Sequence, residues 1–167
     1  LLAGDKSLYA SNNYTSCFGV KKGTYYVAVK NSDKYYGLKV TFISVKENSG
    51  NSKSKAKSIS KGSTRKGVIT ANQKAGTGEW YKFVVKKTQK VTLKVNTKLG
   101  GYSGGIKFAV YKKGDRYPFG SRNAYDTASG EIQPYTFGKG EKLAAGTYYI
   151  KVEKYSDGNG YYSIKWK

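Results

Sequence analysis

Hydrophobic and polar residues alternate with a period of two in several short stretches of this chain. Tyr81, Phe83 and Val85 fall on one side of such a stretch, and residues 91–95 and 106–111 alternate in the same way. Because alternate residues of a β-strand point to the same face, these stretches predict strands with one buried face. No segment of 11 or more residues has the 3.6-residue apolar period of a helix. The pattern therefore predicts an all-β protein.

One strand pattern occurs twice. Residues 23–29 read Gly-Thr-Tyr-Tyr-Val-Ala-Val, and residues 146–152 read Gly-Thr-Tyr-Tyr-Ile-Lys-Val. A second alternating stretch follows each copy at a similar distance, at residues 38–42 and at residues 162–166. Two alternating stretches joined by a polar turn are typical of a β-hairpin, so we expect a repeated hairpin.

The repeat and the composition divide the chain into three parts. Residues 47–62 are rich in serine and lysine with almost no apolar side chains, and they predict a solvated linker. Residues 63–167 contain a complete series of expected strands, so we predict that they form a β-sandwich that folds independently. Residues 1–46 correspond only to the second half of the same module.

The N-terminal half-module is too short to be stable alone. About 45 residues without a disulfide or a metal bury too little surface. We therefore expect its apolar face to be covered by the C-terminal module, by an upstream peptide, or by intermolecular strand pairing of residues 1–46 with another chain. That face consists of Tyr25, Val27, Val29, Leu38, Val40 and Phe42.

The charge of the chain indicates its class of partner. The 31 lysines and arginines outnumber the 10 acidic residues, which gives a net charge of +21. Such a field favours anionic partners. The alternative is that the lysines only keep a tyrosine-rich sandwich soluble. Nucleic acid is an unlikely partner because no reading motif is present, and no 18-residue apolar run predicts a transmembrane segment.

The residues that support catalysis are few. The chain has no histidine, which excludes Ser-His and Cys-His pairs and the commonest metal ligand. Cys17, the single cysteine, lies on a strand expected from Tyr14 to Val20 and is interpreted as a buried small hydrophobe. The acidic residues are scattered singly, and most are expected to be surface partners of lysine rather than a glycosidase pair. The glycine-rich residues 100–105 lack the lysine and the helix of a phosphate-binding loop. We predict no enzyme, no cofactor and no metal site.

Six strand motifs in a fixed order carry a resemblance to a known family. They are Gly-x-Ile (67–69), Glu-Trp-Tyr-Lys-Phe-x-Val (79–85), Val-x-Leu-x-Val (91–95), Phe-x-Val-Tyr-x-x-Gly (108–114), Leu-x-x-Gly-Thr-Tyr-Tyr-Ile-x-Val (143–152) and Gly-Tyr-Tyr-x-Ile (160–164). In this order they resemble the bacterial pre-peptidase C-terminal domain, which is related to clostridial collagen-binding domains. The resemblance implies a small secreted, jelly-roll-like antiparallel β-sandwich attached to extracellular proteases and surface proteins. Glu79 stands where members of the family often have aspartate, and the chain lacks the acid-rich loops of the calcium-binding relatives. The resemblance therefore does not imply a calcium site in this chain.

The same alternation predicts a candidate ligand face. The expected core consists of Tyr81, Phe83, Leu93, Phe108, Tyr148, Ile150 and Tyr162. The opposite faces of these strands carry Trp80, Lys82, Lys94, Lys107, Tyr111, Tyr149, Lys151 and Lys165. Aromatic rings beside cations suit a polysaccharide, an anionic polymer or an extended peptide. The alternative is that these aromatics only cover the sheet or pack against a neighbouring module.

Together these features predict a non-catalytic binding or adhesion module of a larger bacterial protein. We expect that protein to be secreted or at the cell surface. The expected ligand is a polymer: a glycan, an anionic wall polymer or an extracellular-matrix peptide. Two alternatives remain. The chain could be the accessory C-terminal domain of a secreted protease or glycosidase, or a purely structural repeat of a stalk.

Overall fold

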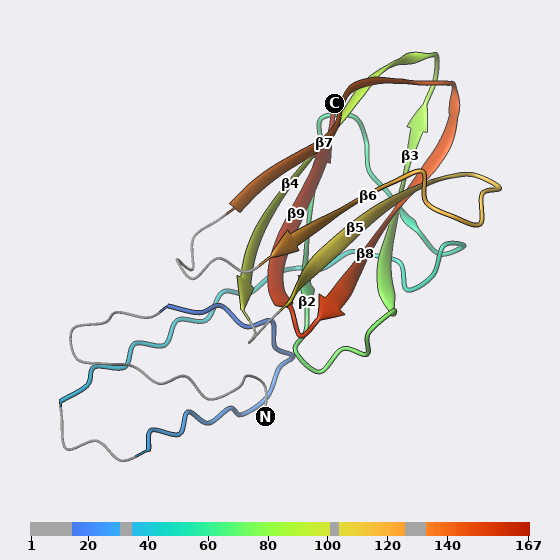
Figure 1. Cartoon of the computed structure of the whole chain (residues 1–167). Helices are drawn as coiled ribbons and strands as arrows, with labels where there is room; N and C mark the ends of the chain where they lie inside the picture. The colour runs from blue at the N-terminus through green and yellow to red at the C-terminus, as the bar shows by residue number, and fades with distance from the viewer. Residues whose placement is uncertain (1–14, 31–34, 101–103, 126–132) are drawn as a thin grey trace.

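The strands of this chain form two sheets that pack face to face (Figure 1). The computed structural model describes residues 15–30, 35–100, 104–125 and 133–167. The strands in these residues are β1 (Lys57–Ser58), β2 (Thr64–Ile69), β3 (Gly78–Val85), β4 (Gln89–Gly100), β5 (Gly104–Lys112), β6 (Gly120–Tyr125), β7 (Gln133–Leu143), β8 (Gly146–Ser156) and β9 (Asn159–Trp166). The described residues contain no helix, and therefore none that could cross a membrane.

The two sheets share the chain in an interleaved order. One sheet has five strands in the order β1-β3-β8-β5-β6, and the other has four in the order β2-β9-β4-β7. Neighbouring strands are antiparallel except β1, which is parallel to β3. Apart from the β5–β6 pair, consecutive strands cross from one sheet to the other. The expected all-β sandwich is confirmed.

The expected core is also confirmed. Its seven side chains are all buried, with exposed fractions of 0% to 3%. Phe83 lies at the centre of an aromatic group, with ring centroids 5.4 Å from Tyr148 and 5.0 Å from Trp166. The indole N–H of Trp166 donates to the backbone carbonyl of Ile59 at 2.9 Å, so its one polar atom is satisfied inside the sandwich.

The repeated unit is not a hairpin in the complete module. β8 pairs with β3 and β5 in the five-stranded sheet, whereas β9 pairs with β2 and β4 in the other. The turn between them therefore carries the chain across the sandwich. Alternation indicates only that each strand has one apolar face. Two such strands can be neighbours in one sheet or can lie in opposite sheets with their apolar faces toward the same interior.

The stretch 47–62 is more than a solvated linker. Gly50 and Trp80 exchange two backbone hydrogen bonds of 3.0 and 2.7 Å, and β1 extends the five-stranded sheet. Ala56 and Ile59 are buried, with exposed fractions of 6% and 2%. The prediction of a solvated linker is therefore wrong for these residues. The sequence did not reveal them because a two-residue strand and two buried apolar side chains produce no alternating pattern in a stretch rich in lysine and serine. Independent folding of residues 63–167 stays a prediction.

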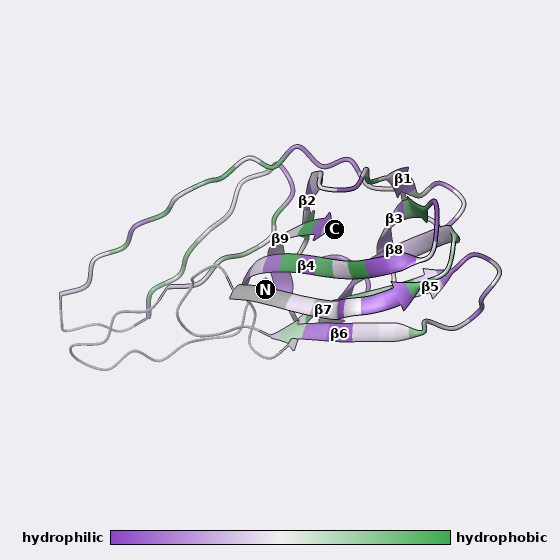
Figure 2. Ribbon diagram, turned by 90° about the horizontal axis from the view of Figure 1, so that it is seen from above, coloured by the Kyte–Doolittle hydropathy of each residue, from purple (hydrophilic) through white to green (hydrophobic). Residues whose placement is uncertain are grey.

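Residues 15–30 and 35–49 form an extended arm that leaves the sandwich (Figures 1 and 2). None of the described residues in this range lies in a strand, and Cys17 is only half-buried. The expected burial of the arm's apolar face is wrong for this chain by itself. Its six side chains have exposed fractions between 38% and 77%. The strands of the sandwich leave these six side chains exposed, and its core is formed by residues from Ile59 onward.

The root of the arm is anchored at one end of the sandwich. The Gly19 N–H donates to the Asn159 side-chain oxygen at 2.9 Å, and its carbonyl accepts from the Ala71 N–H at 2.8 Å. Asn159 is fully buried and also donates to the Gly100 carbonyl at 3.1 Å. A Cβ atom at Gly19 would lie 2.1 Å from the Ile69 carbonyl oxygen, so a larger residue would push the arm away.

Candidate functional site

The eight side chains expected on one face lie on both sides of the sandwich. Six of them belong to β3, β5 and β8, on the outer face of the five-stranded sheet, which we call the aromatic face: Trp80, Lys82, Lys107, Tyr111, Tyr149 and Lys151. Lys94 and Lys165 lie opposite one another on β4 and β9 of the other sheet. The single-face expectation is therefore wrong for these two, because alternation does not reveal which sheet a strand joins.

The aromatic face is centred on Trp80 and Tyr111. Their ring centroids lie 5.4 Å apart across β8, the strand that separates β3 from β5. Lys151 of β8 lies in register with Trp80 on one side and Ala109 on the other, whereas Tyr111 lies opposite Tyr149. Ala109 is fully buried although it points to the outside of the sheet. Larger side chains of this face therefore cover it.

The cations of this face are partly compensated within the protein. The Lys151 amino group lies 5.9 Å from the centre of the Trp80 ring, pairs with Glu153 and donates to the Gly76 carbonyl at 2.9 Å. Lys107 lies 3.8 Å from the same Glu153 carboxylate. Two ammonium groups thus share one carboxylate, and the group keeps a positive charge.

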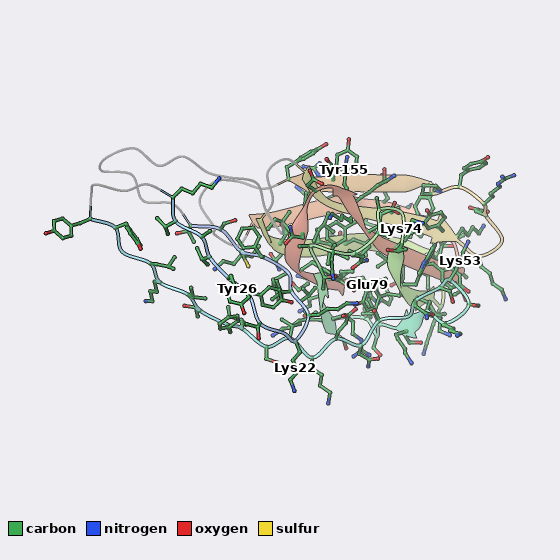
Figure 3. The ribbon with its side chains drawn as sticks, turned by 90° about the horizontal axis from the view of Figure 1, so that it is seen from below. Lys22, Tyr26, Lys53, Lys74, Glu79 and Tyr155 are labelled. Carbon is green, nitrogen blue, oxygen red and sulfur yellow. The ribbon has the colours of Figure 1, made fainter. Side chains whose placement is uncertain are left out.

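Lys53 belongs to the aromatic face although the sequence did not place it there. Its amino group lies 5.0 Å from the ring centre of Tyr111 and 5.3 Å from that of Tyr149, and it donates to the Asp115 carbonyl at 2.8 Å. Figure 3 shows Lys53 at the end of the sandwich remote from the arm. Burial raises the pKa of Tyr111, an effect that Lys151 opposes. No sequence pattern could have indicated Lys53, because its position depends on the pairing of Gly50 with Trp80.

A second polar group lies inside the sandwich. Glu79 is 8% exposed and accepts a hydrogen bond from the Tyr162 hydroxyl, which lies 2.8 Å from the Tyr81 hydroxyl. Burial, together with a hydrogen bond to Glu47, raises the pKa of Glu79 to about 9. The expectation that acidic residues are surface partners of lysine is therefore wrong for Glu79. Glu153 does pair with a lysine, Lys151, as expected.

The Glu79–Glu47 pair does not have the carboxylate spacing of a glycosidase. Two carboxyl groups that hydrogen-bond to one another are closer than the roughly 5 to 9.5 Å that separates glycosidase carboxylates. Within the described part of the chain, no group of three or more acidic or cysteine side chains could hold a metal ion. The arrangement is that of a neutral carboxyl within a hydrogen-bonded core network.

An apolar cleft of about 220 Å³ opens between the edges of the two sheets. It contains none of the eight expected site residues. Its walls come from β4, β5, β6 and β7 and from the turn before β6: Val91, Leu93, Val110, Phe119, Gly120, Ser121, Gly138, Glu141 and Leu143.

Comparison with known proteins identifies similar folds. No family model and no curated protein matches the chain. Among solved structures, the pre-peptidase C-terminal domain of a collagenase from Bacillus anthracis is similar at 23% identity and a TM-score of 0.45, covering 66% of this chain and 93% of that one. A structure described as "CBM4 structure and function" has 11% identity and a TM-score of 0.37, covering 62% and 79%. The periplasmic g-type lysozyme inhibitor PliG of Aeromonas hydrophila has 15% identity and a TM-score of 0.34, covering 66% and 96%. The first belongs to the family that the sequence resembles.

Proposed function

We propose that this chain is a non-catalytic module that binds an anionic polymer at the aromatic face. The observation that carries the proposal is the assembly of Trp80, Tyr111 and Tyr149 with lysines at their faces and edges. Sugar rings stack on aromatic side chains, and sulfate, phosphate or carboxylate groups pair with lysine. An acidic glycan or a wall polymer with both features suits this surface.

The charge balance supports an anionic partner. Even if every acidic residue neutralised one basic residue, 31 − 10 = 21 positive charges would remain. Both ion pairs on the aromatic face go to the single carboxylate of Glu153. A polymer with many negative groups would be attracted by the whole field and oriented by the rings.

The proposal includes the setting of the module. A binding module without catalytic groups serves a larger protein by holding it near a surface or a substrate. We place this chain in a secreted or cell-surface bacterial protein, as its resemblance to pre-peptidase C-terminal domains implies.

Binding to a sulfated glycan and to a teichoic acid tests the proposal. The double variant K82Q/K107Q should weaken binding about 5- to 30-fold, since each exposed ion pair contributes roughly 0.5 to 1 kcal/mol. The matched control K94Q/K165Q removes the same charge from the opposite sheet and should have a smaller effect. Binding should fall steeply as salt rises above physiological strength, where the Debye length is ~8 Å.

Other results would reject the proposal. Equal losses in the two double variants would mean that net charge alone attracts the polymer. Binding to a neutral glycan that survives molar salt would indicate stacking without ion pairing. An absence of binding at low salt would favour a structural role, for which the observed contact of Lys53 and Lys151 with the rings is the supporting feature.

A further inference from the structure

The exposed arm repeats two strands that are fully covered elsewhere in the same chain. The six apolar positions in β8 and β9 have exposed fractions of 0% to 3%, whereas their counterparts in the arm have 38% to 77%. The counterparts are Tyr25 for Tyr148, Val27 for Ile150, Val29 for Val152, Leu38 for Tyr162, Val40 for Ile164 and Phe42 for Trp166. The arm therefore presents a row of core-type side chains to solvent.

The local structure of the two copies agrees at the start of each repeat. The Tyr148 hydroxyl donates to the Ala144 carbonyl at 3.0 Å, and the Tyr25 hydroxyl donates to the Lys21 carbonyl at 2.6 Å. In both copies the acceptor is four residues before the tyrosine. The arm thus keeps this local hydrogen bond of the complete module without its neighbouring strands.

The complete copy shows what covers such a pair of strands. β8 lies between β3 and β5, β9 lies between β2 and β4, and the two face one another across the interior. By analogy with β8 and β9, residues 23–29 and 37–43 would pair with other strands, and a hairpin between the two segments would not reproduce that arrangement. Each needs a strand on both sides, and both need an opposing sheet.

We propose that the arm forms the last two strands of a second sandwich, whose remaining strands come from another β-rich polypeptide segment. That partner supplies the counterparts of β2 to β7, with an apolar interior that accepts the six exposed side chains. The module in this chain cannot be the partner, because its own β8 and β9 occupy these positions. A second copy is equally filled, and two chains of charge +21 repel one another.

A fusion protein supplies the missing strands and tests the proposal. Residues 47–145 are duplicated and joined directly before residue 23 of the chain, so that the arm follows a β2–β7 series as β8 does. We expect backbone amides of 23–29 and 37–43 to exchange at least 100-fold more slowly than in the unfused chain. The calorimetric enthalpy of unfolding should about double, because it scales with the number of ordered residues.

Two controls make the result decisive. In one fusion, V27D and V40D place charges at interior positions, and protection of the arm should be lost. In the other, residues 146–166 replace 23–43, which shows the signal of a complete second module. If this control is protected and the native arm exchanges as fast as in the unfused chain, the proposal is wrong. Concentration-dependent protection of the arm in the unfused chain would also overturn it, in favour of self-association.

Discussion

The two copies of the Gly-Thr-Tyr-Tyr pattern differ in their surroundings far more than in their sequence. In the sandwich, the copy at residues 146–166 supplies buried core side chains, while residues 23–30 and 35–43 of the other copy extend into solvent (Figure 1). Both make the same tyrosine-to-carbonyl hydrogen bond. The shared tyrosine-to-carbonyl hydrogen bond therefore needs only residues close in sequence, whereas strand pairing and burial need neighbouring strands. Covering a large side chain is worth roughly 1.5 to 3 kcal/mol, and the arm gains little of this alone.

The largest expected difference between the copies concerns their last aromatic residues. Trp166→Ala should lower the free energy of unfolding by about 3 to 5 kcal/mol, because it empties a core site beside Phe83 and leaves the Ile59 carbonyl unpaired. Phe42→Ala should change it by less than about 0.5 kcal/mol, since Phe42 is 77% exposed. Urea denaturation measures both. Similar losses would show that the arm folds with the sandwich.

A second difference is linked to protons, because Tyr162 hydrogen-bonds Glu79 whereas its counterpart Leu38 has no hydroxyl. The pKa of Glu79 is raised to about 9 in the folded state, so the unfolded state loses this proton at lower pH. The stabilisation from the neutral carboxyl is complete below about pH 4.5 and is lost as pH rises toward 9. Glu47, Tyr81 and Tyr162 surround the carboxyl and are neutral or negative.

Stability measured from pH 5 to 8 tests this linkage. The unfolding free energy should fall by roughly 1 kcal/mol for each pH unit. The chain has no histidine, so no other side chain has its ordinary pKa in this window. Glu79→Gln should flatten the dependence, while Glu153→Gln should leave it in place. A slope that persists in the Glu79 variant would show that another group carries it.

The smallest expected difference concerns the hydrogen bond that the copies share. Tyr148→Phe should reduce stability by about 0.5 to 1.5 kcal/mol, because the Ala144 carbonyl loses its partner next to the core. Tyr25→Phe should leave global unfolding unchanged, since the arm does not contribute to the sandwich core. Chemical denaturation of the two variants gives the comparison. A loss in the Tyr25 variant equal to that of Tyr148 would contradict it.

The candidate site was predictable only in part. Alternation identified Trp80, Tyr111 and Tyr149 as outward-facing, because side-chain direction follows directly from strand period, but the predicted set left out Tyr155 at the end of β8, which is 42% exposed. It could not separate Lys94 from Lys107, since both alternate with buried residues but lie on opposite sheets. Lys53 was missed because a long-range backbone pairing places it over the rings. Glu79 was misread because its hydrogen-bond partner is 83 residues away.

The all-β class, the seven expected core side chains and the start of each repeat could be read from the amino-acid sequence alone. These features depend on period-two alternation and on turns of a few residues, which act within one strand. The folded structure was needed to show which sheet each strand joins, which lysines contact the aromatic rings, and that the two copies have different environments. Strand pairing and burial are interactions between segments that are distant in the sequence, so a local pattern does not reveal them. An identical local pattern is therefore a core in one place and an uncovered arm in another.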